Sequence, residues 1–190
     1  MPDYRRWFRG GGTYFFTVVT FNRRKIFRHS HARESLHRAI AEVRALRPFE
    51  MLGAVLLPDH CHCMWKMEPD DDDFSVRWGM IKRRFTGLWL ACGGQDAPVS
   101  GSRTKRGEHG VWQRRFWEHL IRDQQDFARH MDYIHYNPVK HGHASCPHQW
   151  KHSSFRRWVK EGVYRPDWLC QCQENRDPPD FEAISHSVGE

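Results

Sequence analysis

The sequence predicts an α+β domain built on one four-stranded antiparallel sheet. Two observations support this prediction. Short apolar runs bounded by glycine, proline and aspartate alternate with longer segments of helical period, and the segments follow the order β-α-β-β-α-β-α. The chain has 190 residues, which is enough for one domain with a substantial core and too few for two large ones.

The first strand is expected at 13–21 (TYFFTVVTF), because aromatic and β-branched residues follow three consecutive glycines there. A helix is expected at 30–46, where apolar residues recur with helical spacing. The apolar runs 49–57 and 60–67 are separated only by a Pro-Asp pair. Two short runs joined by so tight a turn predict an antiparallel hairpin.

Three further elements are expected in the second half of the chain. Apolar residues at helical spacing predict a helix over 74–88, and the Gly-, Ser- and charge-rich segment 93–110 is typical of a flexible, basic surface loop. A fourth strand is expected at 111–122, followed by a helix over 123–136 that Pro138 closes. Four strands and these helices in this order fit a ferredoxin-like β-α-β-β-α-β core, with two helices on one face and one extra helix.

The predicted main domain covers residues 1–168. Its last part, 149–168, is rich in aromatic residues that can dock on the core, whereas 169–190 is expected to be a polar, flexible tail. No apolar run approaches the roughly 20 residues of a membrane span, and the first residues lack an apolar signal core. We therefore expect a cytoplasmic protein without a membrane partner, whose six scattered cysteines are reduced thiols.

The composition favours an anionic partner. Lys and Arg number 30 against 23 Asp and Glu, which gives a formal net charge of +7, and clustered cations gain by displacing counterions from phosphate. The nine Trp, twelve Phe and five Tyr offer flat surfaces on which unpaired bases can stack. Basic and aromatic character together indicate nucleic-acid binding, and a Trp-rich protein without such a partner is the alternative.

Two histidines alternate with two cysteines in PDHCHCMWKM, residues 58–67. In a strand, His60 and His62 lie on one face, about 7 Å apart along the chain, and can converge on one cation. The thiols of Cys61 and Cys63 then point the opposite way and are expected to pack. From this spacing alone, core histidines without a metal and a zinc site built from all four residues remain alternatives.

A third ligand can come from the helix expected at 123–136. Opposite its apolar stripe runs a polar stripe at positions i, i+4, i+7 and i+11, which comprises Asp126, His130, Tyr133 and Asn137. A helix with one buried side and a second side of this kind can place a tyrosine, a histidine and an amide beside the histidine pair.

Three sequence blocks resemble the motifs of a known family. LPDHCHCMW, WQRRFWEH and MDYIHYNPVKHG resemble, in that order, the motifs of the REP-associated tyrosine transposases, a branch of the HUH single-strand transposases and nucleases. The likeness extends from the N-terminus to about Trp168. It implies a ferredoxin-like fold and a metal-dependent, single-stranded DNA endonuclease and strand-transferase. Such an enzyme acts on REP-type hairpins with a short flanking recognition sequence, as a monomer or a homodimer.

The resemblance also implies roles for individual residues. His60 and His62 would be paired metal ligands, and Asn137 would complete the site where related transposases carry a glutamine. Tyr133 would be the nucleophile that forms a 5′-phosphotyrosine. Tyr136 lies about one residue off the same helix face, so the motif rather than the spacing favours Tyr133. Two imidazoles and a neutral amide suit Mg²⁺ or Mn²⁺, with Zn²⁺ as an alternative.

Proton transfer and DNA binding require further residues. His130 lies on the helix face from which it can accept the phenol proton, and pairing with Asp126 is its alternative role. Cations beside aromatic rings suit single-stranded DNA or the foot of a hairpin, and exposed cations can follow phosphates. On these grounds the expected DNA contacts are Arg5, Arg6, Trp7, Arg9, Lys82, Arg83, Arg114 and Arg115.

A second class of function is open at this stage. A nucleic-acid-binding or regulatory protein, specific for REP or other sequences, can retain the fold and the basic surface without useful catalysis. A protein that only binds nucleic acid has no need of a complete set of metal ligands and a nucleophile. The presence of all four residues therefore argues against this alternative: His60, His62, Tyr133 and Asn137.

Overall fold

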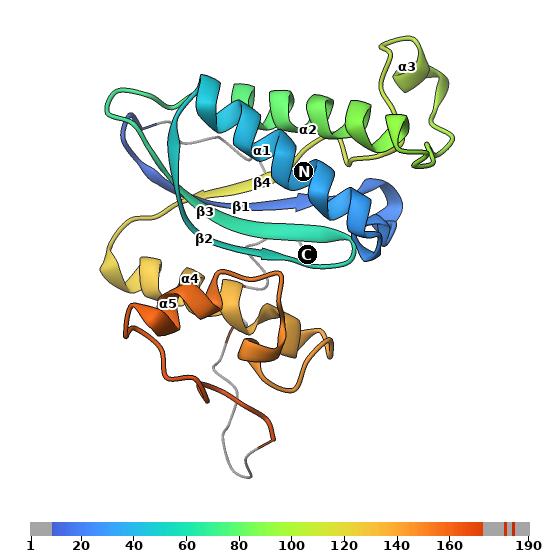
Figure 1. Ribbon diagram of the computed structural model, residues 1–190. Helices are drawn as coiled ribbons and strands as arrows, with labels where there is room; N and C mark the ends of the chain where they lie inside the picture. The colour runs from blue at the N-terminus through green and yellow to red at the C-terminus, as the bar shows by residue number, and fades with distance from the viewer. Residues whose placement is uncertain (1–8, 173–180, 182–183, 185–190) are drawn as a thin grey trace.

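The computed structural model describes residues 9–172, 181 and 184. Its centre is a four-stranded sheet of order β2-β3-β1-β4, in which every neighbouring pair is antiparallel (Figure 1). A helix follows β1 and another follows β3, so the order is that of a ferredoxin-like core, and the predicted fold class is confirmed. The strands are β1 (Thr13–Val19), β2 (Phe49–Leu56), β3 (His60–Met67) and β4 (Trp117–Leu120).

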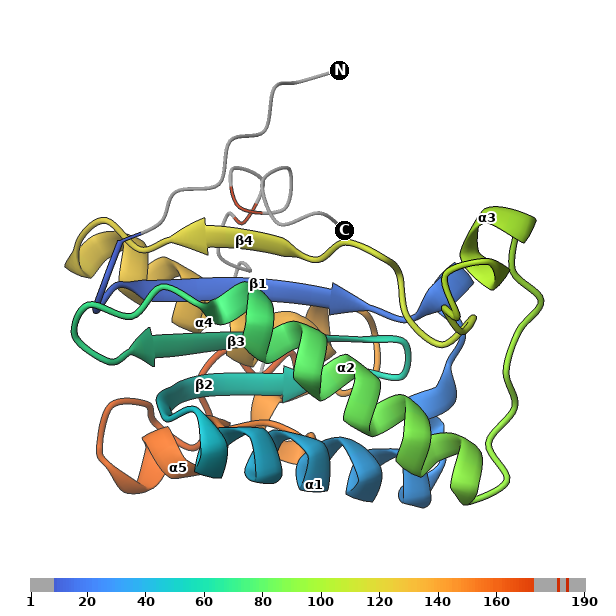
Figure 2. The same cartoon turned by 90° about the horizontal axis from the view of Figure 1, so that it is seen from above.

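Two helices cover one face of the sheet. α1 (Ser30–Leu46) and α2 (Phe74–Ala91) lie side by side on this face, as both views show (Figures 1 and 2). Alternate positions of the strands direct their side chains into the apolar cluster beneath these helices. Trp65 of β3, for example, stacks on Trp78 of α2 with ring centroids 4.5 Å apart.

The opposite face of the sheet carries α4 (Gln124–Lys140) and α5 (Phe155–Lys160), below the sheet in Figure 1. A second apolar cluster fills this side of the protein. α4 approaches β2 closely at Gly53, where an added Cβ would lie 2.4 Å from the sulfur of Met131, so a larger residue there would force the Met131 side chain to move. β3 therefore contributes alternate side chains to two separate clusters.

Two predicted boundaries are wrong. The fourth strand, expected at 111–122, is a strand only over 117–120, because Trp112 pairs in an isolated bridge with Thr20 and exposed residues separate the two pieces. The helix that was expected to end before Pro138 continues to Lys140. Proline removes only its own N–H, and the next turn still forms because the N–H of residue 141 donates to the carbonyl of residue 137 at 3.0 Å.

The 93–110 loop contains a short helix, α3 (Gly101–Thr104), and is fastened to the body of the protein. The Arg103 guanidinium donates to the carbonyl oxygen of His109 and lies 4.7 Å from the centre of the Phe21 ring. This arginine of the basic loop therefore makes internal contacts.

Residues 149–168 run along the edge of β2. The Ser154 N–H donates to the Ala54 carbonyl at 2.8 Å, and the Trp150 indole N–H donates to the Leu56 carbonyl at 3.0 Å. These contacts cover the backbone groups that an edge strand would otherwise expose. In the described part of the chain, no helix has the length and apolar character needed to cross a membrane.

Candidate active site

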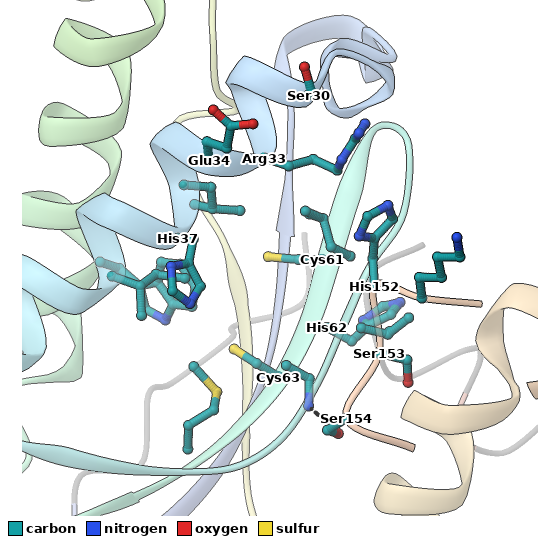
Figure 3. A pocket seen from close by; sticks show the side chains of 18 residues that line it. Ser30, Arg33, Glu34, His37, Cys61, His62, Cys63, His152, Ser153 and Ser154 are labelled. Atoms are coloured by element: carbon teal, nitrogen blue, oxygen red, sulfur yellow. Dashed lines mark hydrogen bonds between the residues drawn. The ribbon is translucent and has the colours of Figure 1, made fainter. Parts of the chain in front are cut away.

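β3 presents its histidines and its cysteines to opposite sides of the sheet. His60 and His62 lie on the side of α4 and are 2% and 0% exposed. Cys61 and Cys63 belong to the apolar cluster beneath α1 and α2, and Figure 3 shows both thiols directed toward α1 with the His62 ring on the other side of the strand. Burial raises the pKa of the Cys61 thiol to about 12, so the thiol stays neutral. This geometry excludes a zinc site built from all four residues.

Each histidine of the pair is oriented by a contact at Nδ1. The His60 Nδ1–H donates to the Asp59 carboxylate at 2.7 Å. Burial alone would raise the pKa of Asp59, but hydrogen bonds from His60 and Arg23 lower it below its ordinary value, so the carboxylate is ionised. The His62 Nδ1 lies 3.0 Å from the hydroxyl oxygen of Thr17. The Asp59 carboxylate keeps the His60 proton on Nδ1 and leaves Nε2 as the nitrogen with ligand character. The ring centroids of His60 and His62 are 4.9 Å apart.

α4 brings a tyrosine against the histidine pair. The Tyr133 side chain is fully buried, and its ring centroid lies 5.4 Å from that of His62 and 6.2 Å from that of Phe15. Asn137, which is also fully buried, follows one helical turn later on the same side of α4. The predicted nucleophile and the predicted histidine ligands thus lie together, between β3 and α4.

Sequence reasoning missed Lys140, which contacts the Tyr133 hydroxyl. Its Nζ donates to Tyr133 Oη at 2.8 Å and lies 4.7 Å from the centre of the ring. Seven residues are about two helical turns, so the two side chains share a face because α4 continues through Pro138. The end of α4 also places His141, whose ring centroid is 5.5 Å from that of His60. The sequence signal for this contact is the spacing of seven residues between Tyr133 and Lys140 in YIHYNPVK. It was missed because the helix was expected to end before Pro138, which would have placed Lys140 outside it.

His130 is held by Asp126, one turn earlier on α4. Its Nδ1 lies 2.8 Å from the Asp126 carbonyl oxygen and 3.1 Å from the carboxylate. Burial alone would raise the pKa of Asp126, but hydrogen bonds from Arg122 and His119 lower it, and burial lowers the pKa of His130. The ligand atoms of His119, Asp126 and His130 lie within 4.8 Å of one another, so this group could also hold a metal. The role of His130 as proton acceptor stays a prediction.

Tyr136, the rival nucleophile, faces the C-terminal segment. Its hydroxyl accepts a hydrogen bond from the Gln171 side-chain amide at 3.1 Å, and its ring centroid lies 5.5 Å from that of Phe181. The Phe181 centroid lies the same distance, 5.5 Å, from that of Tyr133, so one aromatic side chain packs on both tyrosines. Tyr133 is the one whose ring contacts the histidine pair.

Half of the predicted DNA contacts belong to the N-terminal segment. Arg5, Arg6 and Trp7 lie outside the described residues. Arg9 is exposed, and its backbone N–H donates to the Tyr14 hydroxyl at 2.6 Å while its carbonyl accepts from the same hydroxyl at 3.1 Å. The DNA-binding role of these residues stays a prediction.

The other predicted DNA contacts lie on α2 and just before β4. Lys82 and Arg83 are on α2, on the face of the sheet opposite to α4. The Lys82 Nζ lies 5.6 Å from the centre of the Phe116 ring. Arg114 pairs with Glu108 at 3.1 Å, and Arg115 is exposed. The contacts of these four residues with DNA stay predictions.

The fold and the site together define a class of protein. A ferredoxin-like sheet with a His-x-His pair on one strand and a buried tyrosine on the adjoining helix is the arrangement implied by the resemblance to the HUH single-strand DNA transposases and nucleases. No family model matches the chain. Two curated relatives match the chain over most of its length. The REP-associated tyrosine transposase of Escherichia coli (strain K12) is 43% identical over 168 residues, which cover 88% of this chain and 91% of that protein. A Haemophilus influenzae protein given the same family name is 42% identical over 169 residues, which cover 88% of this chain and 93% of the relative.

A solved structure agrees with these relatives. The structure of a REP-associated tyrosine transposase bound to a REP hairpin matches with a TM-score of 0.76 and 42% identity, over 96% of each chain. The chain therefore belongs to the REP-associated tyrosine transposases, and it is an enzyme of the transposase class.

Proposed function

We propose that this enzyme cuts single-stranded DNA at REP-type hairpins with a short flanking recognition sequence, and joins the ends again, through a covalent bond between Tyr133 and a 5′-phosphate. The observation that carries the proposal is the buried Tyr133, with the His62 ring 5.4 Å from its own ring and the Lys140 Nζ 2.8 Å from its hydroxyl oxygen. The similarity to a transposase whose solved structure holds a REP hairpin supports the choice of substrate.

The histidine pair fits a divalent metal. Both imidazoles are held at Nδ1, by Asp59 and by Thr17, which is how metal-binding histidines are usually oriented. His60 and His62, with the amide oxygen of Asn137, form a neutral donor set that suits Mg²⁺ or Mn²⁺ with water and phosphate oxygens as further ligands. When bound there, the ion would neutralise negative charge that develops on the phosphate and on the leaving oxygen.

The covalent step exchanges one ester bond for another. The Tyr133 oxygen attacks phosphorus, so that an O–P bond forms while the bond from phosphorus to the 3′ oxygen breaks. The phenol loses its proton, and the 3′ oxygen gains one and becomes a free 3′-OH. Because the phosphotyrosine is still an ester, the 3′-OH of another strand can reverse the step without ATP. Cleavage and joining are then one reaction run in two directions.

Lys140 can make the Tyr133 phenol a better nucleophile by stabilising its phenolate form. A phenol has an ordinary pKa near 10 and is mostly protonated at neutral pH. An ammonium group that donates a hydrogen bond to the phenol oxygen stabilises the phenolate more than the phenol, because the interaction is charge-assisted. We therefore assign Lys140 as the group that activates the nucleophile.

Lys140→Met is expected to slow adduct formation by about 10- to 100-fold, the loss expected for one hydrogen bond to a charged group. The rate of the variant should also keep rising to higher pH than that of the wild type, since the phenolate then forms without a cation beside it. Single-turnover rates across a pH series measure both effects. Lys140→Arg should restore most of the rate, and Lys160→Met, at an exposed position on α5, is the matched control. A wild-type pH profile in Lys140→Met contradicts the assignment.

Phe181→Ala is expected to speed adduct formation by up to about 10-fold. The Tyr133 side chain is buried and the Phe181 ring packs on it, so a DNA phosphate can reach Tyr133 only after Phe181 moves. An aromatic contact of this kind is worth about 0.5–1.5 kcal/mol, which sets the size of the expected effect. Single-turnover rates at saturating hairpin measure the effect. Val163→Ala, which truncates an exposed apolar side chain, is the control. An unchanged or slower rate in Phe181→Ala would show that Phe181 does not restrict access.

Incubation with single-stranded REP hairpins tests the proposed function. A protein–DNA adduct that survives denaturation is expected with Mn²⁺ or Mg²⁺ present and is expected to disappear with a chelator. Hairpin binding without any adduct under these conditions would instead favour the non-catalytic binding protein.

A further inference from the structure

Four potential metal ligands gather where the chain leaves α4. Cys146 immediately precedes the short 3₁₀ helix η3 (Pro147–Gln149), and His148 lies within it. Cys170 and Cys172 lie just beyond the segment 149–168 that runs along β2. The ligand atoms of Cys146, His148 and Cys170 lie within 4.8 Å of one another. The Cys172 Sγ lies 3.1 Å from the Cys146 Sγ, although the two residues are 26 positions apart in the sequence. Three thiols and one imidazole thus meet from two distant segments.

Two separations in this cluster approach those of a tetrahedral site. Structural zinc sites of the Cys₃His type have Zn–S bonds of about 2.3 Å and Zn–N bonds of about 2.0 Å, so neighbouring ligand atoms lie about 3.5–3.8 Å apart. The Cys170 Sγ lies 3.6 Å from the His148 Nδ1. The separation of 3.1 Å between Cys146 and Cys172 is about 1 Å longer than a disulfide bond. Cys172 is exposed, so its side chain can move to complete the site around the other three ligand atoms, which already lie within 4.8 Å of one another.

The backbone holds the two segments together. The Gln171 N–H, between the two C-terminal cysteines, donates to the Ser145 carbonyl at 2.9 Å. Cys146 and Cys170 are 0% and 2% exposed, so two of the thiols are shielded from water as the ligands of a structural metal usually are. The Gln171 side chain reaches the hydroxyl of Tyr136 on α4. A metal at this point therefore lies beside the helix that carries the nucleophile.

We propose that Cys146, His148, Cys170 and Cys172 bind one Zn²⁺, which holds residues 170–172 against the segment 146–148 that follows α4. Binding replaces the protons of three thiols with one cation, so the site takes up Zn²⁺ and releases protons. Thiolates select Zn²⁺ over Mg²⁺, in contrast to the imidazole and amide donors beside Tyr133. The two metal sites are thus chemically distinct and can be tested separately.

Cobalt titration of the full-length chain tests the site without DNA cleavage. Reduced, metal-free protein is titrated with Co²⁺ alone while the absorption spectrum is recorded. One equivalent is expected to produce a thiolate-to-cobalt charge-transfer band and the intense d–d bands of a tetrahedral site, and one equivalent of Zn²⁺ is expected to remove them. A double variant, His60→Ala with His62→Ala, is expected to give the same spectrum, so the result does not depend on the proposed catalytic metal.

Single substitutions assign the ligands. Cys172→Ser changes an exposed side chain and is expected to leave the fold intact while weakening Zn²⁺ binding by about 10-fold or more, since changes outside the ligand shell alone cost 10- to 100-fold. Cys92→Ser, at an exposed cysteine far from the cluster in sequence, is the matched control and is expected to bind as the wild type does. The proposal is overturned if the wild type gives no charge-transfer band, if Cys172→Ser binds Zn²⁺ as tightly as the wild type, or if freshly purified protein contains a Cys146–Cys172 disulfide.

Discussion

Tyr133→Phe is expected to abolish the covalent protein–DNA adduct while hairpin binding persists. The substitution removes only the phenolic oxygen and leaves the buried ring, which packs against Phe15 and His62. Loss of the hydrogen bond from Lys140 costs about 1 kcal/mol of folding free energy, so the fold survives. Denaturing gels measure the adduct, and a mobility-shift assay with the same hairpin measures binding.

Tyr136→Phe is the matched control for this experiment. Its hydroxyl accepts from Gln171 and its ring packs on Phe181, so its loss is expected to leave adduct formation close to the wild-type rate. If adducts survive Tyr133→Phe, or if Tyr136→Phe alone removes them, the nucleophile has been assigned to the wrong residue.

His62→Ala is expected to reduce metal-dependent adduct formation by about 10³-fold or more, because a bound metal contributes several kcal/mol of charge stabilisation in the transition state. The substitution removes an imidazole whose ring centroid lies 4.9 Å from that of His60 and 5.4 Å from that of Tyr133. Binding of Mn²⁺ to the protein, followed by calorimetry, should weaken in parallel with the rate.

The neighbouring residue in β3 offers the control for His62→Ala. Cys61→Ala changes a side chain on the opposite face of the same strand, and it is expected to cost some stability and to leave Mn²⁺ binding unchanged. A variant of Cys61 that loses the metal, or a His62→Ala protein that still binds Mn²⁺ and forms adducts at the wild-type rate, contradicts the placement of the metal on the histidine face.

The division of β3 into a histidine face and a cysteine face was predictable because it depends on strand period alone. The pleat directs successive side chains to opposite sides whatever surrounds the strand, so His60 and Cys61 diverge as the pattern predicted. The groups that orient the histidines were not predictable. Asp59 is adjacent in sequence, but Thr17 comes from β1, which pairs with β3 only in the folded sheet.

The end of α4 shows how one local rule misled the prediction. Pro138 is a helix breaker by propensity, so Lys140 was placed beyond the helix, yet tertiary packing carries α4 through it and turns Lys140 onto the hydroxyl of Tyr133.

The proposed zinc cluster was concealed for a different reason. Its ligands come as a Cys-x-His pair and a Cys-x-Cys pair, neither of which has the usual Cys-x-x-Cys spacing. Only the contact between two distant segments, such as the Gln171 N–H with the Ser145 carbonyl, brings the four side chains together.

Localising the DNA attachment within the adduct tests the central claim most directly. Cleavage of the purified adduct after Arg129 and Lys140 releases the peptide HMDYIHYNPVK, which contains both candidate tyrosines, and fragmentation in the mass spectrometer separates them. The account predicts a nucleotide joined through its 5′-phosphate to Tyr133. Attachment to Tyr136, attachment to any other residue, or linkage through a 3′-phosphate would contradict it.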